Sequence, residues 1–158
     1  MRRIRVYVDT SVFGGVADEE FADPSRRFFD RVKRGDFFVL LSLHTADELA
    51  GAPAQVKQLV ESLPTECIER VRSDDEVAAL AEAYIAAGVL GGASELDARH
   101  VAAATVARAD VLLSWNFKHL VNYDRIRKFN GVNVLNGYAT IDIRSPLEME
   151  YEGQDQDV

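Results

Sequence analysis

Short apolar segments alternate with helical ones along almost the whole chain, and this alternation is the strongest constraint on its fold. Residues 4–8, 37–42 and 110–114 are mostly apolar, as strands buried on both faces are. Weaker strand patterns cover residues 66–71 and 132–135. Helices are expected between these segments, at residues 24–34, 45–50, 53–63, 74–88, 95–109 and 118–130. This order predicts an α/β three-layer sandwich with a central parallel sheet of about 4–5 strands.

The composition is that of a globular protein able to fold without covalent support. A chain of 158 residues, with 47% hydrophobic and 28% charged residues, can bury a sizeable core. Its single cysteine, Cys67, excludes a disulfide framework, and a reducing cytoplasm is the expected location. The arginines at the start lead directly into a strand pattern, so no signal peptide is expected. No apolar run is long enough to cross a membrane.

Much of the net charge of −8 lies near the C-terminus. Residues 148–158 hold five acidic residues and no basic one, which leaves 21 acidic and 18 basic residues elsewhere. We therefore expect one domain over residues 1–147, followed by an acidic and flexible tail over residues 148–158. The overall acidity argues against a protein that coats DNA.

Four polar side chains stand at the ends of predicted elements. Asp9 follows the first strand, Glu48 lies in the helix after the second strand, and Asp97 opens the helix that precedes residues 110–114. Asn116 follows that last strand closely. Ligand sites of parallel α/β folds lie beyond the carboxyl ends of the strands. Carboxylates gathered there suit Mg²⁺ or Mn²⁺, which prefer oxygen ligands.

The same residues also have local explanations as helix caps or turn residues. Thr45 and Ser94 stand three residues before Glu48 and Asp97, which is the spacing of a capping box. Asp9 could likewise cap a turn or short helix, and the asparagine could belong to a turn. Caps need not lie near one another, whereas a metal site requires its ligands to converge.

Four segments resemble the motifs of PIN-domain proteins, in particular the VapC-like toxin ribonucleases of toxin–antitoxin pairs. They are VYVDTSVFGG at residues 6–15, SLHTADEL at 42–49, ELDARHVAAATVARADVLLSWNFKHL at 95–120 and VNVLNGYATIDIRSP at 132–146. No single motif is decisive, but their order and spacing together are fairly specific. The resemblance implies a PIN-like fold over nearly the whole chain.

By this resemblance, the chain is expected to be a metal-dependent endoribonuclease with Asp9, Glu48, Asp97 and Asn116 as catalytic residues. The three acids match the metal-binding positions, and Asn116 falls where many members carry a fourth acid. A neutral amide adds an oxygen but no charge, so a second ion would be held less firmly. The bound Mg²⁺ or Mn²⁺ would activate a water for attack on an RNA phosphodiester.

Several side chains are candidates for contact with RNA. Thr10, Ser11 and Lys118 could meet a substrate phosphate, although the two hydroxyls could equally cap a turn. Trp115 could stack on a base, but an aromatic side chain beside a strand end is more often part of the core. Three basic clusters could meet the RNA backbone: Arg2, Arg3 and Arg5; Arg26, Arg27, Lys33 and Arg34; and Lys118, Arg125, Arg127 and Lys128. The second cluster is better explained as the solvated face of a helix.

The resemblance also implies a small antitoxin protein as a partner, and a homodimer is the default expectation. Two other functions compete with the nuclease. A dehalogenase-type phosphatase needs D-x-D at the first strand end, where this chain has Asp9, Thr10 and Ser11. A catalytically weak or inactive PIN-like module that binds RNA or protein would suit the neutral Asn116.

Overall fold

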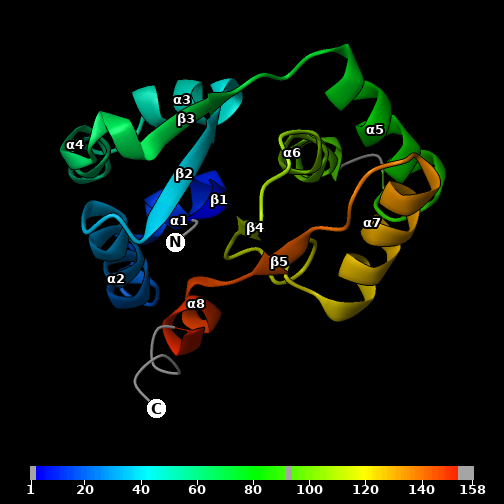
Figure 1. The fold of residues 1–158 in the computed structure, drawn as a ribbon. Helices are drawn as coiled ribbons and strands as arrows, with labels where there is room; N and C mark the ends of the chain where they lie inside the picture. The colour runs from blue at the N-terminus through cyan, green and yellow to red at the C-terminus, as the bar shows by residue number, and fades with distance from the viewer. Residues whose placement is uncertain (1–2, 92–93, 153–158) are drawn as a thin grey trace.

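Strands and helices alternate along the chain in the computed structural model, which describes residues 3–91 and 94–152 (Figure 1). The strands are β1 (Ile4–Val8), β2 (Phe37–Ser42), β3 (Ile68–Val71), β4 (Val111–Leu113) and β5 (Asp142–Arg144). The helices are α1 (Thr10–Gly15), α2 (Ala22–Lys33), α3 (Leu43–Ala50), α4 (Ala54–Ser62), the 3₁₀ helix η1 (Thr65–Cys67), α5 (Asp75–Ala86), α6 (Glu95–Val106), α7 (Tyr123–Leu135) and α8 (Pro146–Glu152).

The strands form one parallel sheet with β1 at its centre. Their order is β3-β2-β1-β4-β5. Val6 of β1 pairs with Val39 of β2 on one side and with Val111 of β4 on the other. The predicted α/β fold with a central parallel sheet is therefore confirmed.

Side chains alternate across the sheet and build one apolar core on each face. Tyr7 of β1, Leu112 of β4 and Ile143 of β5 pack with α5, α6 and α7. Val6 and Val8 of β1 pack with α1 to α4 and with α8 on the opposite face. Figure 1 shows the two groups of helices on either side of the sheet. Because both faces are covered, the strands can be apolar at every position.

The order of the strands also fixes where a ligand site should lie. From β1 the chain builds β2 and β3 outward in one direction, and it then returns to place β4 and β5 on the other side of β1. The direction in which strands are added therefore reverses between β1 and β4. In open parallel sheets, the crevice beyond the carboxyl ends of two such strands is the usual binding site.

The predicted strand at residues 132–135 was wrong, because these residues form the last turn of α7. Phe129 and Val132 are buried while Val134 and Leu135 are exposed, which is the one-sided burial of a helix. The fifth strand is instead β5, which the sequence did not indicate because Ile143 stands alone between Asp142 and Arg144. The helix predicted at residues 118–130 begins only at Tyr123, where the Asn122 side chain caps it.

The acidic C-terminal segment begins as part of the folded domain. Residues 146–152 form α8, which packs against α2, and Met149 is only 1% exposed. Arg31 donates a hydrogen bond to the Met149 carbonyl oxygen at 2.9 Å, and Arg27 pairs with Glu150. Residues 153–158 of the expected flexible tail lie outside the described residues. None of the helices in the described part of the chain is long and apolar enough to span a membrane.

Candidate active site

Asp9 is a buried carboxylate held by hydroxyl groups at the end of β1. Its side chain is 8% exposed, although it directly follows a central strand. Ser11 and Ser114 donate hydrogen bonds to Asp9 Oδ2 at 3.0 and 2.8 Å. The Asp9 side chain makes no capping bond to α1. The buried carboxylate therefore links the end of β1 to the residue that follows β4, and it does not cap α1.

Asn116 connects this arrangement to the start of α6. Its side-chain nitrogen Nδ2 donates to Asp97 Oδ1 at 3.4 Å, and its oxygen Oδ1 accepts from the backbone of His119 at 3.0 Å. Its backbone N–H donates to Ser114 Oγ, which in turn bonds to Asp9. Three of the four predicted catalytic residues, Asp9, Asp97 and Asn116, thus belong to one hydrogen-bonded network beyond the carboxyl ends of β1 and β4.

Asp97 carries electrostatic strain in its ionised form. Burial raises the pKa of the Asp97 carboxyl, and the negative charge of Asp9 raises it further, whereas His119, His100 and the Asn116 hydrogen bond lower it. In the described residues, neither Asp9 nor Asp97 forms an ion pair with a lysine or arginine. Ser94 does not cap the helix through its side chain, so the predicted capping box is absent.

Glu48 stands apart from these residues. The α3 helix is capped by Ser42, whose side chain accepts a hydrogen bond from the Thr45 backbone, so the alternative Thr45–Glu48 capping box does not form. The Glu48 carboxylate pairs with His44 one turn earlier in α3. It lies near enough to raise the pKa of Tyr7, as Asp9 does. Its place among the metal ligands stays a prediction.

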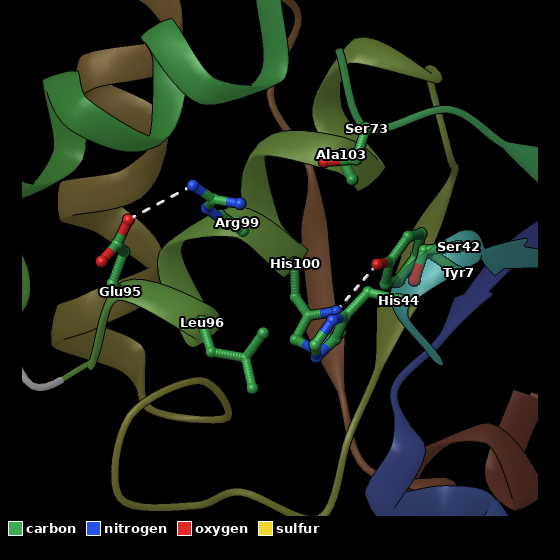
Figure 2. A pocket seen from close by; sticks show the side chains of 9 residues that line it. All are labelled: Tyr7, Ser42, His44, Ser73, Glu95, Leu96, Arg99, His100 and Ala103. Carbon is green, nitrogen blue, oxygen red and sulfur yellow. Dashed lines mark hydrogen bonds and ion pairs between the residues drawn. The ribbon is translucent and has the colours of Figure 1, made fainter. Parts of the chain in front are cut away.

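Tyr7 and His100 lie directly behind Asp9. The Tyr7 hydroxyl and His100 Nδ1 are 2.8 Å apart, and His100 Nε2 lies 3.6 Å from Asp9 Oδ1. Burial raises the pKa of the Tyr7 phenol, so its hydroxyl stays protonated. The other ring nitrogen of His100, Nε2, is the one that faces Asp9. Figure 2 shows the Tyr7–His100 contact.

The donor set fits a divalent cation held by few protein ligands. Asp9 and Asp97 supply carboxylate oxygens, and their mutual repulsion is what a cation relieves. Within residues 3–91 and 94–152, no three His, Cys, Asp or Glu side chains lie close enough together to hold a metal ion. Mg²⁺ commonly binds through one or two carboxylates and keeps several waters. A site of this kind would use Asp9 and Asp97 and would need no third protein ligand.

The three residues predicted to meet a phosphate have different surroundings. The Ser11 hydroxyl already has hydrogen-bond partners, because it donates to Asp9 and accepts from the Trp115 backbone at 3.0 Å. Thr10 Oγ1 is a buried oxygen that forms no hydrogen bond among the described residues. Lys118 is exposed two residues after Asn116. Lys118 thus has an exposed ammonium group, whereas the Thr10 hydroxyl lacks a hydrogen-bond partner among the described residues but is shielded from solvent.

The other basic side chains proposed for RNA are mostly engaged elsewhere. Arg5 bonds to the backbone of residues 107 and 108 and to Glu69, at the opposite end of β1 from Asp9. Arg3 lies over the Phe38 ring, and Arg2 is outside the described residues. The remaining contacts are those of Arg26 with the Val16 carbonyl, Arg27 with Glu150, Arg34 with Asp36, Arg125 with the Val89 carbonyl, Arg127 with Tyr123 and Lys128 with Asp124.

Trp115 belongs to the core and not to a base-stacking surface. Its ring stacks on Phe21 with centroids 4.2 Å apart, and its Nε1 donates to Ser25 Oγ at 2.9 Å. Phe117, two residues later, is the aromatic side chain of this loop that is exposed, at 46%. Sequence reasoning did not single out Phe117, and the serine at the end of β4 also escaped it.

A pocket of about 490 Å³ opens beside the carboxylates. Figure 2 shows its lining, with Tyr7 and His44 on one side and Glu95 and Arg99 of α6 on the other. His100 belongs both to this lining and to the contact with Asp9. The acidic network is therefore one side chain away from a cavity of the size used for small ligands.

Comparison with known proteins bears on the fold. No protein-family model and no curated protein matches the chain. Among solved structures, it is similar to a chain of VapBC2 from Rickettsia felis, determined bound to a DNA fragment from their promoter. The TM-score is 0.58 over 90% of this chain and 98% of that chain, with 10% sequence identity. The sheet order and this similarity together confirm that the chain has a PIN-like fold, of the kind found in VapBC2.

Proposed function

We propose that this protein is a metal-dependent endoribonuclease that hydrolyses RNA phosphodiester bonds. The observation that carries the proposal is the meeting of Asp9, Asp97 and Asn116 in one hydrogen-bonded network beyond the carboxyl ends of β1 and β4. Two carboxylates placed together without a lysine or arginine partner among the described residues call for a cation. The PIN-like fold puts this network where such sheets bind ligands.

The chain's own residues have distinct tasks in this mechanism. Asp9 and Asp97 would hold Mg²⁺ or Mn²⁺, and Glu48 is the third acid proposed to contribute to its binding. A bound divalent cation supplies positive charge for the phosphoryl transition state and lowers the pKa of a coordinated water. Asn116 orients Asp97 through its amide, and Ser114 orients Asp9. Thr10 and Lys118 would hold the scissile phosphate.

Cleavage of single-stranded RNA by the purified protein tests this function. Wild type should cut in Mg²⁺ or Mn²⁺ and stop in EDTA. Asp9→Asn and Asp97→Asn should abolish cleavage. Each replaces a carboxylate ligand with a neutral amide of about the same size. Asp124→Asn is the matched control, since this acid lies in an exposed pair with Lys128 on α7. RNA binding without metal-dependent cleavage would instead identify a non-catalytic module.

The fold also supports a proposal about partners. The similar structure contains VapBC2 and promoter DNA, and we propose that a small antitoxin protein binds this chain in the cytoplasm. Co-purification of a short protein with the chain from native cells would support this proposal. Recovery of a free monomer or homodimer from those cells would contradict it, and the same size measurement reports on homodimerisation.

A further inference from the structure

We propose that the pocket beside the carboxylates binds the guanine base of a ribonucleotide next to the cleaved phosphate. This inference rests on the proposed nuclease function for its placement, but the pocket's chemistry can be tested without cleavage. It follows from three properties of the lining, namely its distance from Asp9, its rings and its paired charges.

The pocket is separated from Asp9 of the proposed site by a single side chain, His100. His100 lines it and also lies 3.6 Å from Asp9 through its Nε2 atom. The volume of about 490 Å³ accommodates one nucleobase with its ribose. A strand whose phosphate lies at Asp9 would therefore bring an adjacent base to this cavity.

The floor and sides of the pocket suit a flat ring. His44 and His100 present imidazole rings whose centroids are 6.1 Å apart, and the His44 side chain is 50% exposed. Leu96, which is also partly exposed, adds an apolar surface. Figure 2 places these side chains between Tyr7 and the charged pair on α6. A base can stack on the exposed His44 ring, as bases do on histidine in RNA-binding proteins.

The charged pair selects among the four bases. Glu95 and Arg99 lie one turn apart on α6, with Arg99 Nη2 3.3 Å from Glu95 Oε1, and both line the pocket. Guanine is the RNA base with two adjacent N–H donors, N1 and N2, beside a carbonyl oxygen. A carboxylate can accept from both donors while the neighbouring guanidinium donates to O6. The Glu95–Arg99 pair offers this combination in this order.

Titration calorimetry with the four ribonucleoside 5′-monophosphates, in EDTA, tests the pocket directly. Guanosine monophosphate should bind about tenfold more tightly than the other three. Glu95→Gln should remove this preference, and Arg99→Ala should weaken guanosine monophosphate about tenfold. Both side chains are at least half exposed, so these variants should fold. Asp124→Asn removes the acid of a similar pair on α7 and should change nothing.

The outcomes separate the pocket from the nuclease. Equal binding of the four nucleotides, no binding of any, or an unchanged guanine preference in Glu95→Gln would overturn the guanine pocket. RNA cleavage that is the same for guanine-containing and guanine-free strands would overturn it too, while leaving the nuclease intact. Guanine-selective binding by a protein that cuts no RNA would uphold the pocket and reject the nuclease.

Discussion

The Ser114 hydroxyl donates a 2.8 Å hydrogen bond to Asp9 and so joins the segments that follow β1 and β4. The register of the two strands explains this contact, because Val8 pairs with Leu113 and the next residue on each strand is Asp9 or Ser114. Ser114 is fully buried and also accepts from the Asn116 backbone. One small side chain thereby positions both the carboxylate and the asparagine of the proposed site.

Removing the Ser114 hydroxyl should impair the site more than the fold. We expect Ser114→Ala to lower metal affinity and RNA cleavage by about tenfold to a hundredfold, as loss of a group that orients a ligand does. Metal titration and cleavage rates measure the effect. Ser25→Ala is a matched control, because Ser25 is equally buried and bonds to Trp115 rather than to Asp9. Equal losses in the two variants would contradict a positioning role.

The pH dependence of stability should reveal the strain at Asp97. The pKa of Asp97 is raised above its ordinary value of 3.8, so the folded state binds this proton more tightly than the unfolded state. Its favourable contribution is complete below pH 3.8 and is lost as the pH rises through the raised pKa. Asp97→Asn should therefore be more stable than wild type at pH 7 in EDTA, with the difference shrinking in acid.

Urea unfolding at several pH values measures this difference. Mg²⁺ should stabilise wild type and have less effect on Asp97→Asn, because binding to the folded state alone adds to its stability. Asp75→Asn alters another acid in a first helical turn and should show neither behaviour. A variant that is less stable than wild type at pH 7 without metal would show that the Asp97 carboxylate is not strained.

The large features of the fold could be predicted because burial on both sides leaves a clear signal. The segments of β1 and β2 are mostly apolar, and the two strands pair in the parallel sheet. β5 gave no such signal, since it is three residues long and only Ile143 is buried in it. The apolar run 132–135 was interpreted as a strand although it ends α7. A run of four residues is too short to distinguish a strand from the end of a helix.

The site was predictable only where strand ends alone determine position. Asp9 and Asn116 follow two strands that turned out to be neighbours, so their convergence follows from the sheet order. The roles of Ser114 and Tyr7 depend on which residues face each other across strands and onto α6, which is set by register and packing. No spacing in the sequence encodes that Tyr7 meets His100, 93 residues away.

The Tyr7 hydroxyl should matter for cleavage through His100. Tyr7→Phe keeps the buried ring and removes the hydrogen bond to His100 Nδ1, so the imidazole loses the partner that orients it toward Asp9. We expect the cleavage rate to fall about fivefold, equivalent to about 1 kcal/mol for one hydrogen bond. Tyr84→Phe removes another buried phenol, which bonds to Asn133 on α7. Tyr84→Phe should lower the free energy of unfolding by about as much as Tyr7→Phe does, and it should leave the cleavage rate unchanged. A reduced cleavage rate in both variants would assign the effect to packing.

The buried position of Met149 predicts that α8 is part of the folded domain. Met149 is 1% exposed and contributes to the core shared with α1 to α4. Met149→Ala should lower the free energy of unfolding by about 2–3 kcal/mol, because it removes buried apolar atoms and leaves a cavity. Glu150→Ala, which removes only the partner of the exposed Arg27, should change it by less than about 1 kcal/mol. Urea unfolding compares the two, and a Met149→Ala protein as stable as wild type would show that α8 is detached from the domain in solution.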